Sequence, residues 1–369
     1  RARRAASAGA AVSARPRLTV DLDALAANYA RLAAEAPGAE IAGVVKADGY
    51  GLGLGPVART LFAAGARRFF VADVEEGRAL AAILPDAVIY VLGGFAAGAR
   101  DAFRGGRLRP VLNTPAQVRA FAALDRRERP AAMLQVDSGM TRLGVPVERI
   151  EELRCELAAL ELDFVLSHLA CADEPDPGFS RTQRRRFEEA RRLLPHLPAS
   201  LANSAGTFLG PDFQYDLCRP GIALYGGNPT PGRANPMAPV VELDAEVLQV
   251  HALDDEARVG YGATYRAPAG ARIATAAVGY ADGVLRCAGN RATARLAGVE
   301  VPLAGRVSMD LVGLDVTAVP ATAAVEGARV KLIWGEDGVE RMAEATDTIA
   351  YEVLVRLGPR VERRYRGGG

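Results

Sequence analysis

The sequence predicts an α/β protein: a parallel (β/α)8 TIM-like barrel followed by a second, mainly β C-terminal domain. Eight short apolar runs, each followed by a stretch with helical spacing, occur before residue 240. This alternation is typical of a right-handed parallel barrel. From residue 241 onward, β-rich runs separated by turn residues replace the helical stretches. We therefore expect a barrel over residues 17–240 and a β domain over residues 241–369.

Residues 1–16 are an Arg/Ala/Ser/Gly segment without an acidic residue. Their composition resembles that of a transit peptide, but a disordered tail is the safer interpretation. Their apolar content is too weak for a secretory signal. We exclude this segment from the predicted fold.

The barrel strands are expected where short apolar runs are bounded by turn residues or helix caps. A short strand at 18–20 precedes the barrel strands. These are expected at residues 41–45, 68–72, 88–92, 110–112, 132–137, 162–168, 201–204 and 219–225. In the β domain the clearest strands are expected at 246–250, 273–278 and 330–334.

Three helix starts have sequence signals of their own. Asp21 or Asp23 can cap a helix after the first short strand. Thr114 is a cap followed by proline at the first helical position. Ser180 with Gln183 fits the spacing of a capping box and predicts the start of the helix after the sixth barrel strand.

Composition narrows the possible partners. The formal charge is +1, from 45 basic and 44 acidic residues without long blocks, which argues against nucleic acid and anionic membrane. The four cysteines lie far apart and the histidines number three, so neither a disulfide framework nor a metal centre is indicated. A reducing cytoplasm fits this cysteine usage. No apolar run is long enough to span a bilayer.

Lys46 ends the first predicted barrel strand, before a glycine-rich loop. The carboxyl mouth of a parallel barrel is where chemistry is done, so Lys46 is a candidate amine nucleophile that can form a Schiff base with a carbonyl compound. A lysine snorkelling from a strand end fits its position about as well. A nucleotide-binding fingerprint does not fit, because the glycines at 49, 51, 53 and 55 alternate and no G-x-G-x-x-G runs through them.

The segment VKADGYG at 45–51 resembles the pyridoxal-phosphate attachment motif of the alanine racemase family. Further motifs extend the resemblance in order from about Thr19 to Tyr365. They are VDSGMTRLG at 136–144, SHLA at 167–170, ANSA at 202–205, LCRPGIALYG at 217–226, VGYGATY at 259–265, GRVSMD at 305–310 and TIAYEVL at 348–354.

The resemblance implies two catalytic bases, Lys46 and Tyr261, because a racemase needs one base on each side of the substrate plane. It implies that Lys46 binds pyridoxal 5'-phosphate and that Arg219 faces the pyridine nitrogen of this cofactor. His168 would connect Arg219 with Tyr261, since a phenol that ionises only near pH ~10 needs a partner that stabilises phenolate. Taken alone, Tyr261 is more typical of a packed aromatic at a turn and His168 of a structural residue.

The resemblance also implies binding residues. The cofactor phosphate would be bound by Tyr50, Ser204, Gly221, Ile222 and Tyr351, since oriented N–H groups and hydroxyls suffice for a phosphate. Each alone has a simpler interpretation: Ser204 can cap a helix and Tyr351 can belong to a core. The substrate would be bound by Arg142 and Met309, which taken alone fit a solvated loop arginine and ordinary core filling.

Three positions depart from the family pattern. Leu52 stands where histidine is common, and Leu311 where glutamine is frequent. Gln135 stands where many members carry a carbamylated lysine, so no carbamate is expected, and the Gln135 amide is expected to support Arg142 without charge. None of the three changes either predicted base.

The resemblance therefore implies a cytoplasmic isomerase, a head-to-tail homodimer with composite active sites, that interconverts L- and D-alanine for cell-wall peptidoglycan. A broad-specificity amino-acid racemase on the same scaffold remains an alternative. A non-catalytic pyridoxal-phosphate carrier would have the lysine but no opposing base, whereas Tyr261 is present. A basic amino-acid decarboxylase shares the two-domain plan, but the motifs at Tyr261 and Arg219 fit racemases better.

Overall fold

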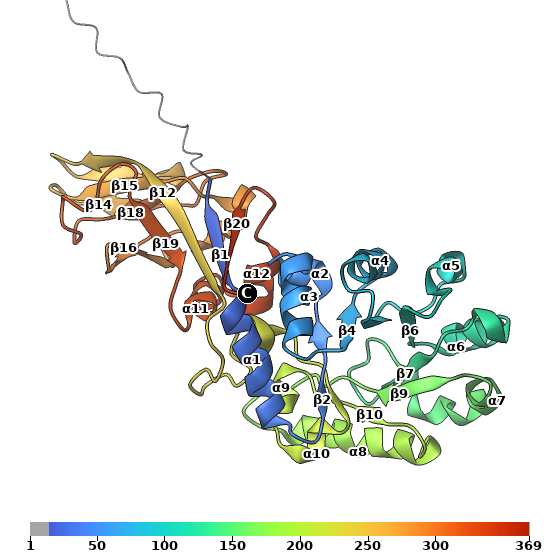
Figure 1. The fold of residues 1–369 in the computed structure, drawn as a ribbon. Coiled ribbons are helices and arrows are strands. Elements are labelled where there is room, and N and C mark those ends of the chain that lie inside the picture. Colours follow the sequence, from blue (N-terminus) through green and yellow to red (C-terminus); the bar gives the residue numbers. More distant parts are fainter. Residues whose placement is uncertain (1–14, 369) are drawn as a thin grey trace, which may run out of the picture. The chain divides into compact units, whose positions relative to one another are not determined.

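The computed structural model describes residues 15–368, which form two compact units (Figure 1). The barrel unit consists of Val20–Val241, Gly335–Glu340 and residues 365–368. The β unit consists of residues 15–19, Glu242–Trp334 and Arg341–Arg364. Apart from its last two residues, the tail expected at 1–16 lies outside the described residues.

The barrel unit is a closed ring of parallel strands, which confirms the predicted barrel. Neighbouring strands pair in parallel in the order β10-β9-β7-β6-β5-β4-β3, and β8 adds to β7. The ring closes because β11 pairs in parallel with β2, and because the Asp216 amide donates to the Ala199 carbonyl (3.1 Å) between β11 and β10. The strands are β2 (Glu40–Ile41), β3 (Gly43–Val44), β4 (Arg68–Val71), β5 (Val88–Val91), β6 (Leu108–Leu112), β7 (Ala132–Asp137), β8 (Val145–Pro146), β9 (Leu162–Leu166), β10 (Ala199–Ser200) and β11 (Leu217–Cys218).

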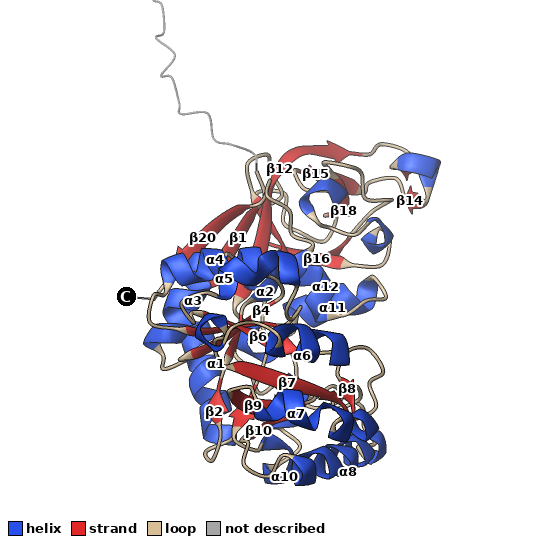
Figure 2. Ribbon diagram, turned by 90° about the vertical axis from the view of Figure 1, so that its right-hand side faces the viewer, coloured by secondary structure: helices blue, strands red, loops and turns tan. Residues whose placement is uncertain are grey.

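Helices lie outside the parallel strands of the barrel unit (Figures 1 and 2). They are α1 (Leu22–Glu35), α2 (Lys46–Tyr50), α3 (Leu54–Ala63), α4 (Val74–Ile83), α5 (Arg100–Phe103), α6 (Pro115–Ala122), α7 (Arg154–Ala158), α8 (Gly178–Leu193), α9 (Ser204–Thr207) and α10 (Pro211–Gln214). Short 3-10 turns lie at Ala97–Ala99, Arg126–Glu128, Val147–Arg149, Glu151–Leu153 and Ile222–Tyr225. As predicted, Asp21 caps α1 and Thr114 caps α6 with their side-chain oxygens.

Three local predictions for the barrel were wrong. The seventh and eighth strands lie about two residues before the predicted 201–204 and 219–225, because Asn203 caps α9 and the apolar residues after Arg219 form a buried 3-10 turn. The predicted capping box is absent, because α8 begins at Gly178 and Ser180 is buried inside it. Gln183 instead accepts from the Ala170 amide (2.8 Å) and donates to the His168 carbonyl (2.9 Å).

The predicted mainly β domain is confirmed, and the β unit is built on one mainly antiparallel sheet. Its order is β17-β16-β19-β12-β1-β20, and β15 joins β12 and β18 beyond a bulge between Val247 and Gln249. The strands are β1 (Arg17–Asp21), β12 (Val241–Ala252), β15 (Arg272–Ala276), β16 (Thr293–Leu296), β17 (Val299–Pro302), β18 (Val312–Asp315), β19 (Arg329–Ile333) and β20 (Glu362–Arg366). The remaining elements are the hairpin β13 (Ala257–Val259) and β14 (Tyr265–Ala267), helices α11 (Gly338–Ala345) and α12 (Ala350–Val355), and 3-10 turns at Tyr261–Ala263, Tyr280–Asp282 and Arg286–Ala288. The elements β1, β20 and α11 each have residues in both units.

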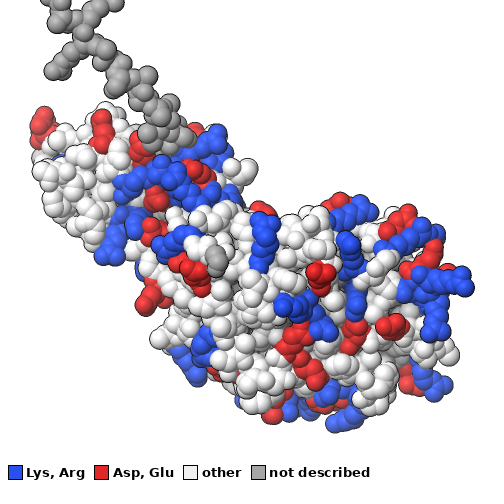
Figure 3. Space-filling model, viewed as in Figure 1, with Lys and Arg blue, Asp and Glu red and all other residues white. Residues whose placement is uncertain are grey.

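Charge and hydropathy of the folded chain agree with its composition. On the face shown in Figure 3, Lys and Arg side chains alternate with Asp and Glu side chains over the barrel unit. Among the helices of residues 15–368, none combines the length and the apolar character that crossing a membrane requires.

Candidate active site

Lys46 lies two residues after the end of β3, at the carboxyl end of the first barrel strand, and begins a turn of left-handed conformation. The backbone φ angles of Ala47, Asp48, Gly49 and Tyr50 are 54°, 55°, 63° and 57°, all in the left-handed region. For each of the three residues with a side chain this costs about 1–2 kcal/mol. The surrounding chain must therefore hold the turn in place.

Hydrogen bonds supply that support. Within the turn, the Gly51 amide donates to the Ala47 carbonyl (2.7 Å). The Asp48 carboxylate accepts from the Leu54 amide (2.7 Å) and ties the turn to the start of α3. From outside, the Glu76 carboxylate accepts from the Ala47 amide (2.7 Å). The residue after the lysine is thus fixed from the neighbouring helix α4.

The electrostatic surroundings of Lys46 favour its neutral amine. Burial is the main cause that lowers the pKa of Lys46, and the positive charge of Arg142 lowers it further. The carboxylate of Glu76 acts in the opposite direction. A larger fraction of neutral amine is what both a nucleophile and a base require.

A buried arginine, Arg219, and a partly buried histidine, His168, lie together at the ends of β11 and β9. The Arg219 guanidinium donates to the Ser167 carbonyl (2.6 Å) and to the Ser200 hydroxyl, and it lies 3.4 Å from His168 Nδ1. Because arginine only donates, Nδ1 is the acceptor and the ring proton is on Nε2. Burial and the charges of Arg219, Arg142 and Lys46 lower the pKa of His168 to about 3, so the ring is neutral at pH 7.

The partners of Arg219 are all neutral, and burial lowers its pKa to about 10. A buried guanidinium is stabilised by an acceptor, since a buried charge without compensation is unfavourable. The position of Arg219 at a strand end therefore suits a ligand that offers a lone pair.

The predicted phosphate-binding residues of the barrel unit come together at the ends of β10 and β11. Ser204 is buried, and its hydroxyl accepts from the Gly221 amide (2.9 Å) and the Ala223 amide (3.2 Å). Tyr50 stacks on Tyr225, with 4.4 Å between ring centroids. A Cβ atom on Gly221 would lie 2.0 Å from the Tyr50 hydroxyl oxygen, so only glycine allows this close approach. Ile222 follows at the start of the buried 3-10 turn.

Arg142 lies on the exposed loop after β7, where Asp137 organises the chain. The Asp137 carboxylate accepts from the amides of Gly139 (2.8 Å) and Thr141 (3.1 Å). Gln135 donates to the Leu143 carbonyl (3.0 Å), so its amide holds the backbone next to Arg142. Leu52 is fully buried, and its carbonyl accepts from the Tyr365 hydroxyl (2.9 Å).

The predicted site residues of the β unit are exposed to solvent. Tyr261 opens the turn between β13 and β14 and is 71% exposed. Met309, on the loop before β18, is 54% exposed, and its carbonyl accepts from the Ala281 amide (2.9 Å). Tyr351, in the first turn of α12, is 39% exposed. Leu311 is also exposed.

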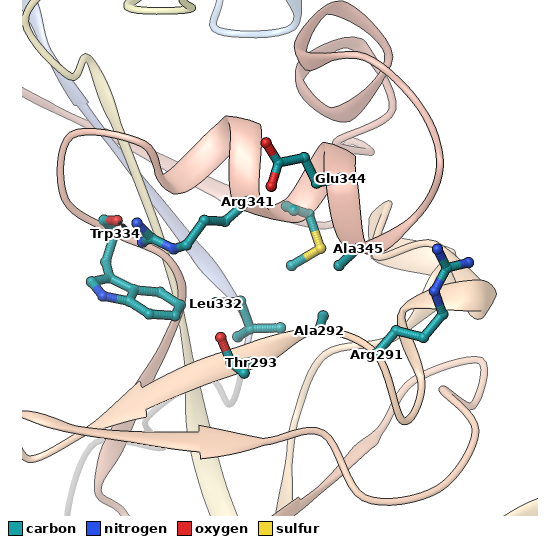
Figure 4. Close-up of a pocket in the computed structure, with 9 residues that line it drawn as sticks. Arg291, Ala292, Thr293, Leu332, Trp334, Arg341, Glu344 and Ala345 are labelled. Atoms are coloured by element: carbon teal, nitrogen blue, oxygen red, sulfur yellow. Dashed lines mark hydrogen bonds between the residues drawn. The ribbon is translucent and has the colours of Figure 1, made fainter. Parts of the chain in front are cut away.

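The β unit also contains a cavity of about 300 Å³ that none of the predicted site residues lines (Figure 4). Between α11, β16 and β19, the Arg341 guanidinium lies 4.4 Å from the centre of the Trp334 ring and donates to the Trp334 carbonyl (2.5 Å). Within residues 15–368, no cluster of three His, Cys, Asp or Glu side chains could hold a metal ion.

Sequence reasoning missed three contributors to the barrel mouth. Ser200 and Ser167 bind Arg219 through a hydroxyl and a carbonyl, for which no sequence signal exists. Glu76 had a signal, since Asp73 three residues earlier gives the spacing of a helix N-terminus. The sequence gives no indication that this carboxylate also reaches Ala47.

Fold and site together define a class of protein: a parallel α/β barrel with an amine of lowered pKa and a donor-only arginine at its mouth, joined to a β unit. Comparisons with known proteins identify the family. The profile of the alanine racemase N-terminal domain matches residues 20–229, and that of the C-terminal domain matches residues 240–365. The chain belongs to the alanine racemase family.

Individual relatives agree over nearly the whole length. The chain is 50% identical over 358 residues to the alanine racemase of Rhodospirillum rubrum, which covers 95% of this chain and 96% of the relative. It is 46% identical over 359 residues to the catabolic alanine racemase of Mesorhizobium japonicum, covering 95% and 93%. The crystal structure of the alanine racemase of Bartonella henselae with covalently bound pyridoxal phosphate matches with a TM-score of 0.90 at 35% identity, covering 96% of this chain and 100% of that chain.

Proposed function

We propose that this chain interconverts L-alanine and D-alanine in a two-base reaction that depends on pyridoxal 5'-phosphate, and so supplies D-alanine for cell-wall peptidoglycan. The observation that carries the proposal is the barrel mouth, where Lys46, His168 and Arg219 come from three strand ends of one ring. The identity of 50% to a named alanine racemase supports the choice of substrate.

The residues present fit the cofactor. Lys46 offers an amine whose pKa is lowered by burial, which suits reaction with an aldehyde. Arg219 offers only donors, which suits an unprotonated ring nitrogen. Ser204, Tyr50 and the backbone at Gly221 and Ile222 form a narrow cradle of hydroxyl and N–H groups, which suits a phosphate. Tyr351 would add a further hydroxyl.

When bound, pyridoxal phosphate supplies an electron sink that makes the α-proton of alanine removable. Lys46 Nζ holds the cofactor and moves the proton on one face of the substrate, and the Tyr261 hydroxyl moves it on the opposite face. Arg142 binds the substrate carboxylate, and Met309 limits the size of the pocket. Because Arg219 cannot hold a proton on the ring nitrogen, the electron sink is weak, and the two bases carry more of the catalysis.

In this proposal, His168 connects Arg219 with Tyr261. Its Nδ1 faces the guanidinium, so its Nε2–H is the group that can donate to a phenolate. We propose that this N–H stabilises the ionised form of Tyr261. A neutral imidazole is suited to the role, since the pKa of His168 is about 3.

The test is the rate of D-alanine formation by the wild type and two variants. Lys46→Ala should lose the yellow colour of the bound cofactor together with activity. Tyr261→Phe should keep the colour and lose at least about 100-fold in racemisation, because one face has no base. A carrier protein would show no turnover in any variant, and a decarboxylase would release carbon dioxide. Unimpaired racemisation by Tyr261→Phe would refute its role as a base.

We further propose a head-to-tail homodimer in which the β unit of one subunit closes the barrel mouth of the other. The exposure of Tyr261 and Met309 supports this, since a base in water-filled surroundings needs cover to act. Mixing Lys46→Ala chains with Tyr261→Phe chains tests it. Random pairing restores one intact site in half of the dimers, which is about one quarter of wild-type activity. A base acting within its own chain would restore none.

Two further expectations belong to this proposal. We propose residues 17–240 as the cofactor-binding domain and 241–369 as the domain that covers it, supported by family matches at 20–229 and 240–365. We also propose a cytoplasmic location, supported by four cysteines that are all free thiols. Rates with serine and other small amino acids would separate a strict alanine racemase from one of broad specificity.

A further inference from the structure

One carboxylate at the start of α4 connects two neighbouring strand ends of the barrel. Asp73 caps α4 by accepting from the Glu76 amide (3.0 Å). Glu76, at the third helical position, turns back and accepts from the Ala72 amide (2.8 Å) with Oε2. Its other oxygen, Oε1, accepts from the Ala47 amide (2.7 Å) of the adjacent strand end. Glu76 thus holds the ends of β3 and β4 together.

The second of these bonds acts on the peptide that follows Lys46. The Ala47 N–H belongs to the peptide plane that contains the Lys46 carbonyl, so the bond to Glu76 sets the orientation of that plane. The same residue begins the left-handed turn, with φ 54° and ψ 51°. Releasing the Ala47 amide would allow the turn to relax and the Lys46 side chain to change direction.

Helix α6 has a residue at the position that Glu76 occupies in α4, and the comparison shows which side chain each set of partners requires. Gln117 stands three residues after the Thr114 cap of α6, just as Glu76 follows Asp73. Its Oε1 accepts from the Asn113 amide (2.8 Å), and its Nε2 donates to the Gly93 carbonyl (3.2 Å). An amide serves there because one partner is a donor and the other an acceptor. At α4 both partners are N–H groups and each donates to its own oxygen, an arrangement that a carboxylate supplies and an amide, with one oxygen, does not.

We propose that Glu76 is a positioning residue that fixes the Lys46 amine at the barrel mouth by holding the Ala47 and Ala72 amides together. The inference rests on the proposed function for its consequence, because the amine that it orients is the one that would bind the cofactor. Glu76 also adds charge: it raises the pKa of Lys46 against burial and Arg142, which lower it. The other titratable groups at this mouth include His168 and Arg219 at neighbouring strand ends, and Asp48, Tyr50 and Tyr225 on and beside the left-handed turn.

The experiment compares Glu76→Gln and Glu76→Ala with the control Glu75→Gln in the full chain. Glu75 is exposed on the same helix turn and pairs only with Arg78 (3.1 Å) among the described residues, so its loss removes a charge without touching the strand ends. The first readout is hydrogen exchange at the Ala47 and Ala72 amides of the holoprotein. The second is the pH dependence of the rate at which cofactor-stripped protein recaptures pyridoxal phosphate, followed by absorbance.

We expect exchange at Ala47 to accelerate by about 10-fold or more in both Glu76 variants and to stay at the wild-type rate in Glu75→Gln. The midpoint pH of recapture should fall in Glu76→Gln, since the removed charge had raised the pKa of Lys46. If the substitution only disturbed the local structure, it would slow recapture of the cofactor without lowering the midpoint pH. Unchanged Ala47 exchange in folded Glu76→Gln, or an unmoved midpoint, overturns the proposal. If the wild type fails to racemise alanine, the proposed function falls, while these two readouts still decide the role of Glu76.

Discussion

Replacing Gly221 by alanine tests the phosphate cradle most directly. The φ of Gly221 is −113°, outside the left-handed region that favours glycine, and the contact that an added methyl group would make with Tyr50 is a steric clash. The new Cβ would lie 2.0 Å from the Tyr50 hydroxyl oxygen and 2.8 Å from its Cζ, whereas ordinary contacts lie near 3.5 Å. The ring of Tyr50 must therefore move by more than about 1 Å.

Tyr50 has little freedom to move. Its ring stacks on Tyr225 at 4.4 Å, and the Tyr225 hydroxyl donates to the Val44 carbonyl (2.8 Å). Tyr50 is also the last residue of α2, which contains the left-handed turn after Lys46. Forcing an extra methyl group into such packing costs about 1–3 kcal/mol. Because Tyr50 and the Gly221 amide both belong to the cradle, cofactor affinity should fall by about 10-fold or more.

The assay measures the free energy of unfolding of the cofactor-free chain and the dissociation constant of pyridoxal phosphate. Gly38→Ala is the matched control, since a Cβ on Gly38 has no neighbour within 4 Å. In a Tyr50→Ala background the clash disappears, so the two substitutions should be coupled by about 1 kcal/mol or more. A Gly221→Ala chain with wild-type stability that binds the cofactor within a factor of about 3 of wild type would refute the reasoning.

Three further outcomes are expected. The pKa of His168 in the folded protein is about 3, below its ordinary value of 6.5. Between these two pH values the unfolded chain binds a proton at His168 that the folded chain does not, so the stability is fully present above pH 6.5 and is lost as pH falls toward 3. Urea unfolding should show a loss of roughly 2 kcal/mol between pH 6.5 and 5 that His168→Gln removes, and an unaltered pH slope in the variant would contradict it. Asp163→Ala leaves the half-buried Arg109 without its ion pair (2.6 Å) and should cost about 3 kcal/mol in unfolding free energy while sparing cofactor binding. Arg142→Ala removes a charge that lowers the pKa of Lys46, so the midpoint pH of cofactor recapture should rise, opposite to Glu76→Gln.

The barrel could be predicted because its strands are buried on both faces. Residues 69–72 and 88–92 are continuous apolar runs, and the structure places β4 and β5 there. The last two strands are only two residues long, so their apolar flanks misled the prediction. Leu224 and Tyr225 are apolar because they lie in a buried 3-10 turn. The pattern of apolar residues does not distinguish such a turn from a buried strand.

For the candidate site, too, the sequence could place some residues and could not predict other features. Lys46 could be placed at a strand end from its sequence alone, and the family motifs named Arg219, His168 and Ser204. The left-handed turn could not be predicted, because Ala47 and Asp48 have no sequence preference that marks a positive φ in succession. The support of Arg142 by Gln135 stays a prediction; the Gln135 amide donates to the Leu143 carbonyl, a backbone contact that the sequence does not indicate.

The two predicted bases, Lys46 and Tyr261, differ in how firmly the surrounding structure holds them, and this difference matters for a two-base reaction. Lys46, His168 and Arg219 stand at ends of strands whose hydrogen bonds fix them, and burial perturbs the pKa of each. Tyr261 stands on a hairpin turn and is 71% exposed. Under the proposed function, the barrel unit holds the cofactor and the amine that serves one face of the substrate, and the opposite face depends on how the exposed Tyr261 phenol is covered. Substitutions around the Tyr261 turn should accordingly change turnover more than cofactor affinity, whereas those around Gly221 should do the reverse.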